Sequence, residues 1–133
     1  MPVRFLLSVA LIASLAACSA KSDTTSSATV TAQPAGDFSV ATQFTPDPPK
    51  QGSETITVTV KDADGNVVKG ATVKISSTMP AMSMVGPTLN ATDNGDGTYA
   101  AQTNLNYATQ WVFDIRIASA GKTGTAHVTQ DVK

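Results

Sequence analysis

Hydrophobic and polar residues alternate in short runs from about residue 37 to the end of the chain. The clearest run is 55–60, where Ile56, Val58 and Val60 form one face and threonines form the other. Alternation of this kind places successive side chains on opposite faces of an extended strand. Valine, isoleucine and threonine also favour strands. The sequence therefore predicts a β-strand with one buried face here.

The same alternation predicts several further strands. They are expected at 38–44, 67–68, 73–75, 99–101, 111–117 and 126–128. The run 111–117 has the heaviest apolar face and marks the expected centre of the core. Clusters of Gly, Pro, Asn and Asp separate the runs, as is typical of turns. About seven short strands without a helical period predict an all-β fold, an immunoglobulin-like antiparallel β-sandwich, with a small Greek-key barrel as the alternative.

A local motif supports the sandwich. The residues Asp96-Gly97-Thr98-Tyr99 resemble the approach to a tyrosine corner, which is a feature of immunoglobulin-like domains. In that motif the tyrosine hydroxyl ties a crossover connection back to the backbone. We therefore expect the hydroxyl of Tyr99 to bond to the backbone of such a connection.

The beginning of the chain has a different pattern, in which one positive charge precedes an apolar run. Arg4 is followed by the run 5–15, which is shorter than the about 20 residues of a membrane span but has the length of a signal-peptide core. Leu15-Ala16-Ala17-Cys18 then resembles the lipobox of bacterial lipoproteins. We predict a lipoprotein signal peptide over 1–17 and lipidation of Cys18. The alternatives are an ordinary signal peptide with an incidental cysteine and an N-terminal membrane anchor.

Residues 18–36 are rich in Ser, Thr and Ala, and Val30 is their only large aliphatic residue. Such a segment has too little apolar surface to order itself, so we predict a flexible tether over 18–36 and a folded domain over 37–133. Ser19 and Ala20 follow the cysteine, where an aspartate in second position would favour inner-membrane retention. We expect a lipid-anchored protein of the bacterial envelope, facing the periplasm or the cell surface, with the outer membrane favoured in a Gram-negative cell.

Charge and residue type exclude several functions. Nine Lys and Arg stand against ten Asp and Glu among 133 residues, so there is no basic field for nucleic acid. Cys18 is the only cysteine, which excludes a disulfide within one chain. His127 is the only histidine and shares its strand phase with two threonines, so it is expected on the surface, where it cannot serve a Ser-His-Asp site. We expect a protein that is not an enzyme.

Two Asp- and Gly-rich segments, 62–66 and 93–97, look like calcium loops. Neither has the later glutamate that completes an EF-hand loop. Hairpin turns are the better interpretation, because Asp, Asn and Gly are the residues that such turns favour.

The candidate chemistry lies in a cluster of methionines. Met79, Met82 and Met84 fall within six residues, in a segment with Pro80 and Pro87 that indicates a loop or a bulged edge. Met82 and Met84 point the same way in extended chain, and a turn after Met79 would bring the third thioether beside them. Thioether sulfur is a soft donor that selects Cu(I) or Ag(I) over hard ions. The alternative is that these side chains plug an irregular gap at the end of the core.

Two further residues are candidates to join the methionines. His127 is a candidate fourth ligand, although its phase favours an exposed position. Trp111 has a ring face that a bound Cu(I) could contact, but its phase matches Phe113 and Ile115, which favours the core.

Four blocks in order carry a family resemblance: 65–73, 79–84, Gly97-Thr98-Tyr99 and Trp111-Val112-Phe113. Together they resemble the YtkA-like (FixH-related) domain over nearly all of 37–132. The resemblance implies an extracytoplasmic immunoglobulin-like fold, often associated with copper handling or cation transport, and no catalytic residues. Many members have a Gly, often with another Met nearby, just before the tryptophan, whereas this chain has Leu-Asn-Tyr-Ala-Thr-Gln at 105–110. If that second Met binds metal in relatives, Met79, Met82 and Met84 must suffice here.

The expected function is therefore a lipid-anchored module that binds Cu(I) or another soft metal for carriage or transport support. Its expected partners are the membrane, through the lipid anchor, and copper-handling or transport proteins. The rival interpretation is a protein-interaction or structural module, in which the methionine loop is an apolar contact or a core plug.

Overall fold

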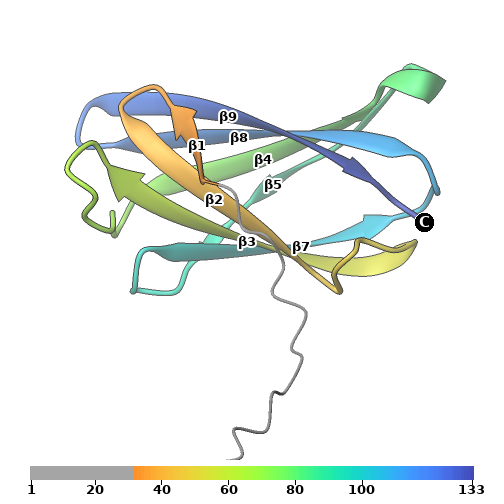
Figure 1. Ribbon diagram of the computed structural model, residues 1–133, viewed down its shortest axis with the longest axis horizontal. Helices are drawn as coiled ribbons and strands as arrows, with labels where there is room; N and C mark the ends of the chain where they lie inside the picture. The colour runs from red at the N-terminus through yellow and green to blue at the C-terminus, as the bar shows by residue number, and fades with distance from the viewer. Residues whose placement is uncertain (1–31) are drawn as a thin grey trace, which may run out of the picture.

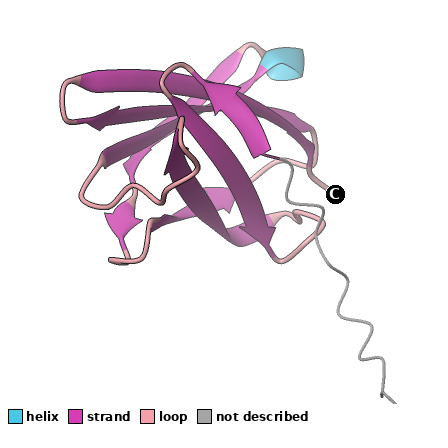
Figure 2. Ribbon diagram, turned by 60° about the vertical axis from the view of Figure 1, so that its left-hand side comes forward, coloured by secondary structure: helices cyan, strands magenta, loops and turns pink. Residues whose placement is uncertain are grey.

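Two antiparallel β-sheets packed face to face form the molecule (Figures 1 and 2). The computed structural model describes residues 32–133, so the predicted signal peptide, Cys18 and most of the predicted tether lie outside the described residues. The first sheet has the strand order β1-β2-β3-β7-β6, and the second has the order β5-β4-β8-β9. The elements are β1 (Ala32–Ala35), β2 (Phe38–Thr45), β3 (Gly52–Asp62), β4 (Thr72–Met79), the 3₁₀ turn η1 (Pro80–Met82), β5 (Met84–Asn90), β6 (Thr92–Asp93), β7 (Thr98–Leu105), β8 (Gln110–Ser119) and β9 (Lys122–Asp131).

The predicted all-β sandwich is confirmed, and residues 32–133 form nine strands rather than about seven. The run 67–68 contributes only a bridge between Lys61 and Val67, while β1, β5 and β6 are additional. Within residues 32–133, no helix is long and apolar enough to span a bilayer.

Strand β1 lies inside the segment that the sequence predicts to be a tether. It pairs with β2 from Ala32 to Ala35, so the folded domain begins before Asp37. The composition does not predict this strand, because backbone hydrogen bonds to β2, and not a row of buried side chains, hold it in an extended conformation. Its last residue, Ala35, is fully buried.

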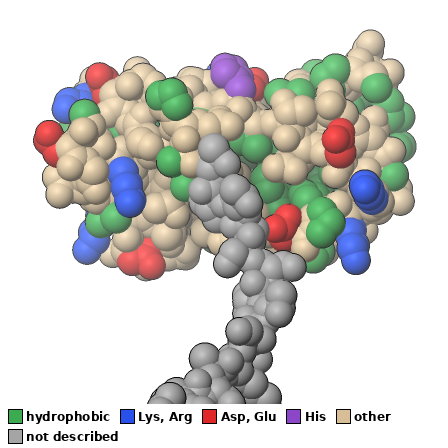
Figure 3. All heavy atoms as spheres, in the orientation of Figure 1, with side chains coloured by type: hydrophobic (Ala, Val, Ile, Leu, Met, Phe, Trp, Pro, Cys, Tyr) green, Lys and Arg blue, Asp and Glu red, His purple; other side chains and the backbone are tan. Residues whose placement is uncertain are grey.

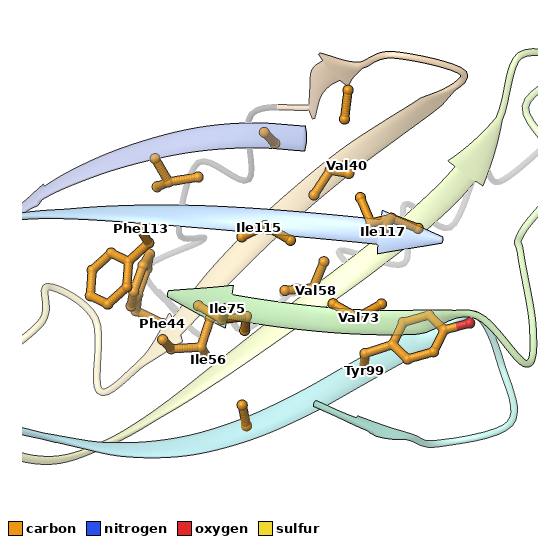
Figure 4. Packing of buried hydrophobic residues seen from close by; sticks show 14 of the residues in the cluster. Val40, Phe44, Ile56, Val58, Val73, Ile75, Tyr99, Phe113, Ile115 and Ile117 are labelled. Carbon is orange, nitrogen blue, oxygen red and sulfur yellow. The ribbon is translucent and has the colours of Figure 1, made fainter. Parts of the chain in front are cut away.

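The core lies between the two sheets. Ile56, Val58 and Val60 of β3 face inward, as their alternation predicts, and so do the apolar residues of β8. The rings of Phe44 and Phe113 meet across the sheets with centroids 5.3 Å apart (Figure 4). The predicted central position of the run 111–117 is therefore confirmed.

Tyr99 bonds to the backbone as expected, but its partners lie 31 and 28 residues away and not the few residues upstream that define a tyrosine corner. The hydroxyl of Tyr99 donates to the carbonyl oxygen of Val68 at 2.7 Å and accepts from the backbone N–H of Ala71 at 3.0 Å. Burial raises the pKa of Tyr99, so the hydroxyl keeps the proton that it donates. These two hydrogen bonds tie β7 to the connection between β3 and β4, and Figure 4 shows the Tyr99 side chain that makes them.

A close approach between β1 and β9 joins the two sheets at one side. Gly124 of β9 lies directly against the backbone of Ala35, and a Cβ at Gly124 would overlap the Ala35 carbonyl oxygen. Glycine is required here because the two backbones pack without room for a side chain.

Candidate metal site in a methionine hairpin

The three methionines lie in one tight connection between β4 and β5, which we call the methionine hairpin (residues 79–84). Met79 ends β4, η1 contains Met82, and Met84 begins β5. Pro80 stands at the start of η1, where its fixed φ suits the turn. Ser83 adopts a left-handed conformation with φ 51°, and its N–H donates to the carbonyl oxygen of Pro80 at 3.2 Å. Figure 1 shows the hairpin projecting at one end of the sandwich, and Figure 2 shows its single helical turn in cyan.

Strand register brings two of the methionines together. Met79 and Met84 are direct cross-strand partners at the end of the β4–β5 ladder. Side chains of such partners stand on the same face of the sheet. The turn that the sequence predicts after Met79 therefore exists, and β5 is an edge strand whose register to β4 is irregular between Ser76 and Thr78.

The three side chains differ in burial. Met79 is the last inward-facing residue of β4 and is 3% exposed. Met82 and Met84 are 42% and 40% exposed, and the neighbouring Val85 is 78% exposed. Figure 3 shows hydrophobic side chains gathered at the end of the molecule that carries the hairpin. The hairpin thus joins the end of the core to an exposed apolar surface.

Trp111 lies near the start of β8, at the end of the second sheet that carries the methionine hairpin. A Cβ added at Gly86 of β5 would lie 3.4 Å from its ring. The antiparallel ladder between β4 and β8 pairs Thr78 with Val112. The next residues in this register are Met79 and Trp111, so these two are neighbours across the strands. Trp111 is buried, and its indole N–H donates to the carbonyl oxygen of Tyr107 at 3.0 Å. The predicted core position of Trp111 is confirmed.

The donor set of this end of the molecule suits only soft ions. Within residues 32–133, no group of three or more His, Cys, Asp or Glu side chains is arranged to hold a metal ion. The methionine hairpin offers thioether sulfur instead, which prefers Cu(I) to Mg²⁺ or Ca²⁺. The residues present therefore fit Cu(I) or Ag(I) and do not fit a hard cation.

The structure separates His127 from the methionine hairpin. His127 lies on β9 and Met84 on β5, which are the opposite edges of the four-stranded second sheet. Three strand spacings amount to about 14 Å. The His127 side chain is 71% exposed, as its phase predicts, and its Nδ1 bonds to Oδ1 of Asp114 at 2.5 Å. The fold does not bring His127 to the methionines as a fourth ligand.

The segments that look like calcium loops are turns. Oδ1 of Asp62 accepts from the backbone N–H groups of Asp64 and Asn66 at 3.0 and 2.9 Å. Oδ1 of Asp96 accepts from the hydroxyl and the N–H of Thr98 at 2.5 and 3.0 Å. These bonds hold the pKa of both carboxyls below the usual value. The carboxylates stabilise their own turns, which confirms the hairpin interpretation.

One buried acid was not singled out from the sequence. Glu54 of β3 is 1% exposed, and neither carboxyl oxygen has a hydrogen-bond partner among the residues that the structure describes. Burial raises its pKa, the nearby backbone N–H of Lys50 opposes this, and the charge of Asp47 raises it further. Its burial could have been predicted from the sequence, because Glu54 is two residues before Ile56 and so lies on the same inward face of the strand.

Comparisons with known proteins agree with this architecture. A family model described as YtkA-like matches residues 32–116. The structure is similar to a DUF4426 family protein from Pseudomonas aeruginosa PAO1, with a TM-score of 0.54, 16% identity, and coverage of 76% of this chain and 94% of that one. It is also similar to the PmoD soluble domain from Methylocystis sp. ATCC 49242, with a TM-score of 0.56, 11% identity, and coverage of 79% and 98%. At these identities the two structures show a shared fold. No curated protein matches the sequence.

Proposed function

Because the chain belongs to the YtkA-like family, we propose that it is a non-enzymatic, extracytoplasmic binding module for Cu(I) or another soft metal ion. Met79, Met82 and Met84 are the proposed ligands. A lipid on Cys18 holds the module on the envelope membrane. The bound ion is carried to, or received from, copper-handling or transport proteins.

The cross-strand pairing of Met79 with Met84, with Met82 in the turn between them, carries the proposal. The Cβ atoms of such partners are about 4.5–5.5 Å apart, within reach of two flexible thioether side chains around one ion. The exposure of Met82 and Met84 gives an ion access from solvent. Met79 stands at the end of the core, where its thioether adds a third, more enclosed donor.

The chemistry of the ligands suits transfer rather than permanent storage. Thioethers are neutral and need no deprotonation before they bind a metal, in contrast to thiols. Met82 and Met84 are in addition open to an incoming partner. The module therefore binds and releases its ion through the exposed Met82 and Met84. The buried Met79 fixes the position of the bound ion.

The test is an anaerobic titration with Cu(I) and Ag(I), followed by NMR through the methionine methyl resonances. The resonances of Met79, Met82 and Met84 are expected to shift together and to saturate near one equivalent, with no response to Mg²⁺. A Met82→Leu/Met84→Leu variant keeps the apolar volume and should no longer bind. Unchanged methyl resonances in the parent protein would contradict the proposal.

The apolar tip favours a second candidate function, because Val85 is 78% exposed beside the methionines. Under this alternative the hairpin is a contact surface for a protein partner, and Met79 is a core plug. Two variants separate the functions. Val85→Ser should weaken a protein contact and leave Ag(I) binding intact, whereas Met82→Leu/Met84→Leu should abolish Ag(I) binding and largely preserve an apolar contact.

The lipid anchor is tested separately from the metal. A Cys18→Ala variant should leave the membrane fraction, because acylation requires the thiol. If Cys18→Ala stays in the membrane fraction, the anchor is not a lipid on this cysteine.

A further inference from the structure

A small groove on the outer face of the second sheet stands apart from the methionine hairpin. It has a volume of about 350 Å³ and is lined by side chains from β4, β8 and β9. This volume is within the range of small-molecule sites. The lining includes two cations, Lys74 and Arg116, and three threonine hydroxyls.

The strand register explains how the groove is built. Two neighbouring rows of exposed residues cross three strands: Thr72–Ala118–Thr123 and Lys74–Arg116–Thr125. The small Ala118 lies between two threonines and leaves a hollow at the centre of the first row. The long side chains of Lys74 and Arg116 bound that hollow along the second row.

The two cations lie side by side without an acidic partner. Lys74 and Arg116 are direct cross-strand partners, an arrangement in which like charges destabilise the sheet. Within residues 32–133, the only side-chain ion pair is between His127 and Asp114. Asp114 is the acid nearest to Arg116 along this face, and it is bonded to His127. Asp131 is the other carboxylate of the face and lies at the far end of β9.

From this arrangement we propose that the groove binds a phosphate group. A free phosphate near neutral pH carries more than one negative charge, and the diester phosphate of a lipid headgroup carries one, so two adjacent cations attract either group. Its several oxygens can accept from a guanidinium, an ammonium and threonine hydroxyls at once, whereas a carboxylate has only two oxygens. The source is a free phosphate or the phosphate of a lipid headgroup, and the experiment separates them.

The experiment follows backbone amide shifts of the full chain by NMR at low salt. One titration uses inorganic phosphate, and a second uses vesicles of phosphatidylcholine with and without phosphatidylglycerol. Saturable shifts at Thr72, Ala118 and Thr123 with inorganic phosphate support a free anion. The same shifts only with phosphatidylglycerol support a lipid headgroup.

Three variants make the test specific. Lys74→Gln/Arg116→Gln is expected to weaken binding at least about tenfold, because it removes both charge-assisted contacts. Ala118→Leu fills the hollow, keeps both charges, and should also block binding. Lys61→Gln/Lys69→Gln makes the same charge change at exposed positions elsewhere and should bind like the parent protein.

Three results would overturn the proposal. One is the absence of saturable shifts with either probe. Another is equal weakening in Lys74→Gln/Arg116→Gln and Lys61→Gln/Lys69→Gln, which would show attraction by net charge alone. The third is normal binding in Ala118→Leu. The variant residues are all exposed, so the fold is expected to survive, and the dispersion of the amide spectrum verifies this.

Discussion

Removing the hydroxyl of Tyr99 tests whether its two long-range hydrogen bonds to the backbone stabilise the sandwich. Tyr99→Phe keeps the fully buried ring and removes one atom. The Val68 carbonyl oxygen then loses a 2.7 Å bond and the Ala71 N–H loses a 3.0 Å bond. Each hydrogen bond contributes about 0.5–1.5 kcal/mol, so the loss is about 2 kcal/mol in the free energy of unfolding. For a domain of this size, that lowers Tm by roughly 8–16 °C.

The assay is urea unfolding followed by circular dichroism, with Tyr107→Phe as the matched control. Tyr107 is 40% exposed, and its hydroxyl makes no hydrogen bond within residues 32–133. The control should stay within about 0.5 kcal/mol of the parent protein, as surface substitutions usually do. If Tyr99→Phe is equally mild, the two hydrogen bonds of the Tyr99 hydroxyl do not stabilise the fold in the way their geometry indicates.

Three further predictions, made with four substitutions, test other parts of the sandwich by the same unfolding assay. Gly124→Ala places a Cβ against the Ala35 carbonyl and should cost about 1–3 kcal/mol; unchanged stability would show that β1 does not pack tightly on β9. Met79→Ala empties a core position and should cost about 2–5 kcal/mol, whereas Met82→Ala should stay near the parent value; equal effects would contradict the difference in burial. The raised pKa of Glu54 means that stability present at acid pH is lost as pH rises through that pKa. Glu54→Gln should remove this decline and be more stable than the parent at pH 7, and a parallel pH profile in both proteins would contradict the assignment.

The sandwich could be predicted because its main strands carry period-2 alternation. Ile56 to Val60 and Trp111 to Ile117 each bury one face, so their pattern is fixed by the core they build. The edge strands are different. β1 and β5 bury few side chains, and their order comes from backbone pairing to β2 and β4, which leaves little trace in composition.

The sequence identifies which residues make up the candidate site, but it does not predict how deeply each of them is buried. The clustering of methionines indicates a shared site, but the depth of Met79 depends on its register in β4, where it continues the inward phase of Ile75. The separation of His127 depends on strand order, which places β9 and β5 at opposite edges. The Lys74–Arg116 pair likewise requires the β4–β8 register. Contacts between residues far apart in sequence were therefore the part that local patterns could not supply.

Because Met79 is buried, the proposed metal binding is expected to stabilise the hairpin. If its thioether binds the ion together with Met82 and Met84, the ion binds only the folded hairpin, and a ligand of that kind raises stability by RT ln(1 + [L]/Kd). Leucine at position 79 preserves most of the packing and removes the donor. A Met79→Leu variant that keeps its stability without ion, but gains less stability from Ag(I) than the parent, would identify Met79 as a ligand. An equal gain would leave Met79 as a packing residue and assign the ion to the exposed pair.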